Sequence, residues 1–179
     1  MSDKGKEYDM LVDYITGKTV PNVGVEEIRQ RVEQYLVEEK GYQKQDICVD
    51  ADIEIDIDGS CYASQLDLVV SVENKRFMVI KCAAGSLESR EREVLSASRI
   101  YDSLPVPYAV VSDSKTAVIY DTVSGKKTDQ GLHAIPSRTE AEKFLNTKQL
   151  TRISENRLKK EKIIFRSYDN MNVNTQRNL

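Results

Sequence analysis

Strict alternation of apolar and polar residues over a long stretch is the feature that most constrains how this chain folds. Every odd position from Ile47 to Ile57 is apolar, whereas the even positions are polar except for Cys48. Because successive side chains of a strand point to opposite faces, this pattern predicts a long strand with one buried face. Asp58-Gly59 follows as a turn, and a second alternating stretch, Gln65 to Val72, places Asp67 on its less apolar face.

The order of the remaining patterns predicts a mixed α/β fold. A nearly all-apolar run, Phe77 to Cys82, is typical of a central strand covered on both faces. Apolar residues at helical spacing predict one helix at Val25 to Glu39 and another at Leu87 to Ser103. Two further strands are expected at Tyr108 to Ser112 and Ala117 to Asp121. We therefore expect a mixed sheet that begins with hairpin-linked strands, continues through a crossover helix and is flanked by helices.

Length and composition indicate a single domain, residues 1–179. The 179 residues are 40% hydrophobic and 31% charged, which suits one folded core. No apolar run approaches the roughly 18 residues that span a bilayer, and Met1 to Leu11 lacks the apolar core of a signal peptide, so a cytoplasmic location is expected. A capping box at Ser137 to Glu140 predicts a helical extension from about residue 138, and residues 172–179 are predicted to be frayed.

Charge is unevenly distributed along the chain. Residues 1–137 carry 16 basic and 24 acidic side chains, whereas residues 138–179 carry 10 basic and 5 acidic ones. A basic tail on an acidic body permits contact with a polyanion, although a solvated helix face explains the same split.

Most familiar catalytic motifs are absent from this sequence. It has no glycine-rich phosphate loop or nucleophile elbow, and the single histidine, His133, does not complete a hydrolase triad. Cys48, Cys61 and Cys82 lack metal-ligand spacing and are expected to be buried strand residues. What remains is a set of carboxylates with a lysine, which suits Mg²⁺ because this hard cation prefers oxygen ligands. Its members are Glu26 or Glu27, Asp67, Lys81, and Glu88 or Glu91.

Four segments of the chain together resemble a known protein family. They are DYITGK (13–18), EEIRQRVEQYLVEEKGY (26–42), LDLVV (66–70) and FMVIKCAAGSLESRERE (77–93). In these segments the chain is similar to the N-terminal domain of type I restriction enzyme R subunits, within the PD-(D/E)XK nuclease superfamily, from about Tyr14 to Pro136. This resemblance implies a restriction-endonuclease-like fold, with a helix, a β-meander, a crossover helix and further strands.

The resemblance also implies roles for individual residues. Glu26, or its neighbour Glu27, matches the acid of the first helix that assists metal binding, and Asp67 matches the metal-binding aspartate of the second strand. The third strand departs from the family, which has an acid, any residue and a lysine where this chain reads Ile80-Lys81-Cys82-Ala83. Whether Lys81 or Val79 is aligned with the acid, one metal ligand is missing from this strand.

Two explanations of the missing acid compete. In the first, the carboxylate has moved to the next helix, where Glu91 is predicted to face the sheet, and Lys81 positions the attacking water. The chain would then be a Mg²⁺-dependent endonuclease that hydrolyses DNA phosphodiesters. In the second, the site has decayed, and the scaffold binds nucleic acid or protein. Each residue also has a simpler explanation. Asp67 could form an ion pair with a lysine, and Lys81 could extend from the end of the sheet into water. Glu91 could belong to a structural ion pair.

The expected partners follow from the same resemblance. Arg29 and Gln30 flank the expected site and are predicted to contact DNA phosphate together with the basic tail. A homodimer or a larger restriction or repair complex is compatible with the sequence, and no membrane partner is expected.

Overall fold

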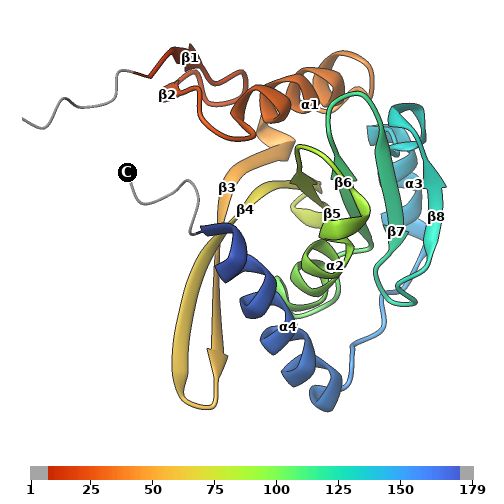
Figure 1. Cartoon of the computed structure of the whole chain (residues 1–179). Helices are drawn as coiled ribbons and strands as arrows, with labels where there is room; N and C mark the ends of the chain where they lie inside the picture. The colour runs from red at the N-terminus through yellow and green to blue at the C-terminus, as the bar shows by residue number, and fades with distance from the viewer. Residues whose placement is uncertain (1–7, 174–179) are drawn as a thin grey trace, which may run out of the picture.

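The computed structural model describes residues 8–173 and contains a six-stranded mixed sheet with helices on both faces (Figure 1). Its strands lie side by side in the order in which they occur along the chain. The first three form an antiparallel meander, β3 (Ile47–Ile57), β4 (Ser60–Val72) and β5 (Lys75–Cys82). The next strand is parallel to β5 and the last two are antiparallel, and these are β6 (Tyr108–Ser112), β7 (Ala117–Asp121) and β8 (Lys127–Gln130).

Helices cover the two faces of this sheet in pairs. The described α-helices are α1 (Glu26–Glu38), α2 (Glu91–Ile100), α3 (Arg138–Thr147) and α4 (Glu155–Val173). Apolar residues of α2 and α4 share one core layer, and those of α1 and α3 share the other. Short 3-10 turns lie at Lys44–Asp46, Glu88–Arg90 and Leu132–Ala134, and a separate hairpin consists of β1 (Met10–Val12) and β2 (Thr19–Pro21).

The predicted order of strands and the crossover helix are confirmed. The three meander strands are neighbours in one sheet, and α2 connects β5 to the parallel strand β6. Helix α2 is shorter than predicted, because a 3-10 turn precedes it and it ends at Ile100 rather than Ser103. The sequence reading missed β1, β2 and β8, since each is short and β8 is exposed at all its positions.

The β3–β4 hairpin changes core layer part of the way along its length. Ile47 and Val49 pack in the α1 layer, whereas Ala51 and Ile53 pack in the α2 layer. Asp50 lies between them with a positive φ of 48°, a conformation that Asp tolerates better than most residues. The twist carries the far part of the hairpin away from the rest of the sheet and alongside α4 (Figure 1).

Two sequence expectations need correction. The prediction that all three cysteines are buried is wrong for Cys48 and Cys61, which are exposed on the hairpin, and correct for Cys82. The frayed end predicted from residue 172 is wrong for residues 172 and 173, which belong to α4, and its remainder lies outside the described residues. Within the described part of the chain, no helix has the length and apolar character needed to cross a membrane.

The basic extension begins as predicted, with the capping box of α3. The Ser137 side chain accepts a hydrogen bond from the Glu140 N–H, and the Glu140 carboxylate accepts one from the Ser137 N–H at 2.7 Å. Helix α4 is then fixed to α2 by a buried ion pair, in which Arg99 Nη1 lies 2.7 Å from Glu161 Oε1. Arg99 also donates to the Thr122 carbonyl at 2.8 Å, so one guanidinium joins α2, α4 and the end of β7.

Removing the cation from this pair should destabilise the protein. Arg99→Met leaves the Glu161 carboxylate buried with only Arg157 nearby, at 3.4 Å, and loss of a buried partner is expected to lower the free energy of unfolding by about 3 kcal/mol. Urea denaturation measures the change. The matched control, Arg31→Met, breaks the exposed pair with Glu27 and should cost less than about 1 kcal/mol. Equal losses in the two variants would contradict the role given to Arg99.

Candidate functional site

The structure brings Asp67 and Lys81 together through the pairing of β4 with β5. Leu68 lies opposite Ile80 in this antiparallel pair. Asp67 precedes Leu68 and Lys81 follows Ile80, so these two residues are opposite each other and lie on the other face of the sheet, toward α2. There, Lys81 Nζ is 3.4 Å from both carboxylate oxygens of Asp67. Asp67 Oδ2 also accepts a hydrogen bond of 2.8 Å from the Cys82 N–H, which fixes the carboxylate against β5.

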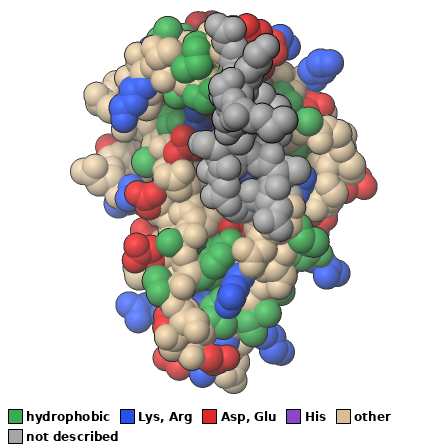
Figure 2. Space-filling model, turned by 60° about the vertical axis from the view of Figure 1, so that its left-hand side comes forward, with side chains coloured by type: hydrophobic (Ala, Val, Ile, Leu, Met, Phe, Trp, Pro, Cys, Tyr) green, Lys and Arg blue, Asp and Glu red, His purple; other side chains and the backbone are tan. Residues whose placement is uncertain are grey.

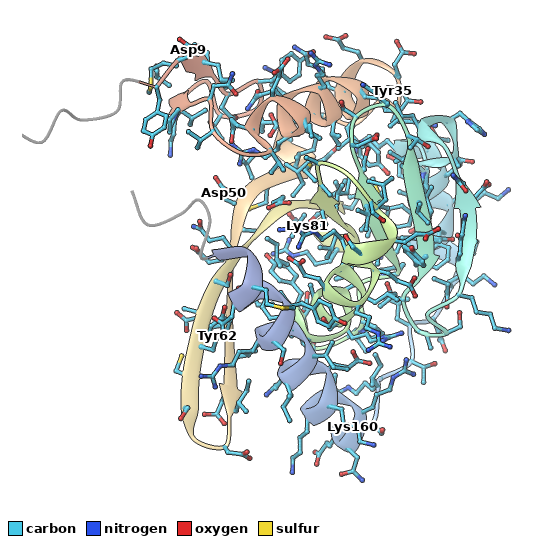
Figure 3. The ribbon with its side chains drawn as sticks, viewed as in Figure 1. Asp9, Tyr35, Asp50, Tyr62, Lys81 and Lys160 are labelled. Atoms are coloured by element: carbon cyan, nitrogen blue, oxygen red, sulfur yellow. The ribbon has the colours of Figure 1, made fainter. Side chains whose placement is uncertain are left out.

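Glu93 of α2 completes this charged cluster. Its Oε1 lies 3.1 Å from Lys81 Nζ, and its Oε2 lies 3.6 Å from Arg90 Nη1. The side chains of Asp67 and Glu93 are each 3% exposed, whereas that of Lys81 is 18% exposed. The lysine, labelled in Figure 3, therefore places one positive charge between two buried carboxylates. We call Asp67, Lys81, Glu93 and Arg90 the lysine cluster.

Glu91, the acid predicted to have moved to the helix, faces a different neighbour. Its carboxylate is hydrogen bonded to Tyr120 of β7, and burial together with this acid raises the pKa of Tyr120 to about 12. The prediction assumed one continuous helix from Leu87, whereas α2 begins only at Glu91, after a 3-10 turn. Because 3-10 and α-helices differ in residues per turn, the assumed spacing from Leu87 does not apply. Glu93 therefore occupies the position that the sequence reading gave to Glu91.

Helix α4 covers the lysine cluster. Phe165 and Asp169 line the same small cavity as Asp67, Lys81 and Glu93, and its volume is about 10 Å³, which is at most the space of one water molecule. Tyr62 of β4 donates a hydrogen bond of 2.6 Å to Asp169, so the hairpin and α4 close the cover together. None of these covering residues was predicted, because the pattern of α4 alone does not indicate which face of the sheet it packs on.

The other predicted site residues form a second cluster at the first helix. Arg29 is 4% exposed, and its guanidinium lies 2.6 Å from Glu26, 2.9 Å from Asp50 and 3.2 Å from Asp13. Gln30 donates to Asp13 at 3.0 Å and to Glu26 at 2.8 Å. Glu26 is therefore engaged with two side chains of its own helix, and the same two side chains hold Asp13 of the loop after β1. Arg29 and Gln30, predicted as DNA contacts, instead hold the N-terminal hairpin against α1.

Glu33 is the most deeply buried acid of this second cluster. Its side chain is fully buried, and its contact with Arg29 Nε is long, at 3.7 Å. Burial, with the nearby Asp13 carboxylate, raises the pKa of Glu33 to about 8. Glu33 is therefore mostly protonated at neutral pH, and its ionisation opposes folding.

The lysine cluster does not fit a divalent metal ion. Asp67 and Glu93 offer the oxygen ligands that Mg²⁺ prefers, but Lys81 and Arg90 already balance their two negative charges. With the lysine in this position, the cavity of about 10 Å³ beside it has no space for an ion with its remaining water ligands. Among residues 8–173, moreover, no group of three or more His, Cys, Asp or Glu side chains is placed to hold a metal.

The fold and this cluster define a mixed α/β domain with two carboxylates and a lysine gathered between neighbouring strands and the crossover helix. Residues 25–136 match the family model of the type I restriction enzyme R protein N terminus. The chain belongs to this family, and α3 and α4 lie beyond the matched region. No curated protein and no solved structure matches the chain significantly.

Removing the ammonium group from the lysine cluster should lower the free energy of unfolding. Lys81→Met leaves the buried Asp67 and Glu93 carboxylates facing each other with Arg90 at the margin, and we expect a loss of about 3–5 kcal/mol in the free energy of unfolding. Lys127→Met, on the exposed strand β8, is the control and should change it by less than about 0.5 kcal/mol. Urea denaturation compares the two. A loss below about 1 kcal/mol for Lys81→Met would show that the ammonium is dispensable.

The raised pKa of Glu33 predicts a specific pH dependence of stability. The folded protein binds the Glu33 proton more tightly than the unfolded chain, in which the pKa of a glutamate is near 4.5. The stability contributed by Glu33 is therefore full below about pH 4.5 and is lost as the pH rises to about 8. Glu33→Gln removes this dependence, so the variant should gain stability relative to wild type from pH 5 to pH 8 in thermal unfolding. A constant difference across this range would contradict the assignment.

Proposed function

We propose that this chain is a DNA-binding domain of a restriction system whose nuclease-like centre does not hydrolyse DNA. The observation that carries the proposal is the Lys81 ammonium between Asp67 and Glu93. In the family pattern, a divalent ion would stand beside the second-strand aspartate. Here a lysine side chain supplies the positive charge at that position permanently, and the centre serves to hold β4, β5 and α2 together.

The order of elements supports a restriction-endonuclease-like scaffold for this domain. A first helix precedes an antiparallel meander, and a crossover helix then leads to a parallel strand, in the order that the family resemblance implies. The missing acid of the third strand, whether Lys81 or Val79 stands in its place, and the cover by α4 favour loss of catalysis while this scaffold is kept. Family membership favours a place in a larger restriction complex.

The outward face of α4 supports a role in DNA binding. Lys159, Lys160 and Arg166 are exposed there, and Figure 3 shows Lys160 pointing away from the body of the protein. The acids Glu161 and Asp169 of the same helix are buried and occupied by Arg99 and Tyr62. Apart from Glu155, the exposed first residue of the helix, α4 therefore presents its positive charges outward and its negative charges inward, which suits contact with phosphates.

The face of the molecule seen in Figure 2 does not carry charge of a single sign. Figure 2 shows Lys and Arg side chains interspersed with Asp and Glu side chains over the face in view. The net charge of the whole chain is −3. DNA affinity should therefore depend on the local basic face of α4 rather than on the field of the whole protein.

The alternative function is a Mg²⁺-dependent endonuclease. It is favoured by the convergence of Asp67, Glu93 and Lys81, which are the side-chain types of such a centre. For this activity α4 would have to move away from the lysine cluster, because the cavity that it covers is too small for a phosphodiester.

The DNA face can be tested by charge reversal. Lys159→Glu/Lys160→Glu should weaken binding to duplex DNA at low salt at least tenfold, and should reduce the slope of log affinity against log salt by about 1–2. The matched control is Lys126→Glu/Lys127→Glu, which makes the same charge change at the start of β8. Fluorescence anisotropy gives both quantities. Equal weakening by the two variants, or wild-type binding that ignores salt, would remove the proposed face.

Hydrolysis can be tested on the full chain. We expect no heat of Mg²⁺ or Mn²⁺ binding in calorimetry and no cleavage of duplex, single-stranded or branched DNA. Metal binding and cleavage that are both lost in Asp67→Asn would establish the nuclease instead. Glu93→Gln and Glu91→Gln then identify the second ligand, because Glu93 contacts the cluster lysine whereas Glu91 is hydrogen bonded to Tyr120.

A further inference from the structure

A separate cavity of about 360 Å³ lies at the opposite end of β5 from the lysine cluster. It is bounded by the β4–β5 turn, the loop between α2 and β6, and the end of α3 with the segment after it. Lys75 begins β5 and lines this cavity, whereas Lys81 lies near the other end of the strand. Six residues at about 3.3 Å per residue separate the two lysines by about 20 Å. The cavity is therefore independent of the nuclease-like centre and of the proposed function.

The lining of this cavity has a cationic side and an apolar side. Lys75, Arg76 and Lys148 contribute three positive charges, and Asp102 contributes one negative charge. Leu104, Leu145 and Leu150 are half-buried and provide apolar surface. Such a combination of apolar walls with a few converging charges is typical of small-molecule sites, which have volumes of about 300–1,000 Å³.

Arg76 is held in place before any ligand arrives. Its Nη1 donates to the Ser71 hydroxyl at 3.1 Å, and its guanidinium carbon lies 5.9 Å from the centre of the Tyr101 ring. Neither contact neutralises the guanidinium. The arginine therefore keeps its full charge with reduced rotamer freedom, which lowers the entropy cost of binding an anion.

The geometry points to a binding site for a terminal phosphate carried on a nucleoside. A phosphate monoester carries about −1.5 to −2 charges at pH 7, which matches the excess of positive charge from Lys75, Arg76 and Lys148 over Asp102. Arg76 offers the planar fork that bonds phosphate oxygens in pairs. The leucine side of the cavity then takes the less polar body of the ligand. A free nucleotide and the 5′-phosphorylated end of a DNA strand share this chemistry.

Calorimetry on the full chain with adenosine monophosphate, adenosine and inorganic phosphate tests the site. We expect the monophosphate to bind at least tenfold more tightly than adenosine, because charge-assisted hydrogen bonds to phosphate are lost without it. Arg76→Ala and Lys148→Ala should each weaken this binding about tenfold, whereas the control Lys160→Ala should not. No binding of the monophosphate at millimolar concentration, or equal binding by adenosine, would overturn the proposal.

Oligonucleotides distinguish the two sources of the phosphate. Anisotropy with a 5′-phosphorylated and a 5′-hydroxyl single strand of the same sequence compares the ends directly. A preference for the phosphorylated end that is lost in Arg76→Ala assigns the site to DNA ends, whereas binding of the monophosphate alone assigns it to free nucleotide. Lys159→Glu/Lys160→Glu, which tests the α4 face, should leave this preference unchanged. Failure of the α4 face and failure of this site are thus separate results.

Discussion

The ion cluster around Lys81 is the interaction on which the arrangement of this domain depends. Two carboxylates that are nearly inaccessible to water would repel each other across the junction of β4 and α2. The ammonium lies 3.1 Å from one and 3.4 Å from the other, and this attraction offsets their desolvation. Because the lysine comes from the neighbouring strand β5, the same contacts fix the crossover helix over the sheet. A centre with the side-chain types of a metal site thus connects β4, β5 and α2.

Two further charged groups connect the elements that flank the lysine cluster. Arg29 gathers Asp13, Glu26 and Asp50, and so attaches the N-terminal hairpin and the bend of β3 to α1. Arg99 attaches α4 to α2 through Glu161. The Arg99–Glu161 pair matters for the proposed function, since α4 both covers the lysine cluster and exposes a basic face. Its position therefore links the cover over the lysine cluster to the exposed basic face.

The sequence predicted the sheet well and the site only in part. Alternation over β3 and β4 and the short turn before β5 were sufficient to place Asp67 beside Lys81, because strand pairing is local there. Glu93 was missed since the 3-10 turn before α2 broke the helical spacing used to choose Glu91. Arg29 and Gln30 were expected on a DNA surface because the hairpin that buries them has no visible pattern of its own. The cover by α4 depends on contacts distant in sequence, which periodicity does not encode.

Anomalous diffraction from crystals of the full chain soaked in Mn²⁺ tests the role of Lys81 most directly. We expect Lys81 Nζ to stay in contact with both Asp67 and Glu93, with no manganese peak between the two carboxylates. A Lys81→Met crystal, soaked in the same way, shows whether the lysine itself excludes the ion. A manganese peak bridging Asp67 and Glu93 in the wild-type protein, with the ammonium displaced, would contradict the account and identify the centre as a metal site.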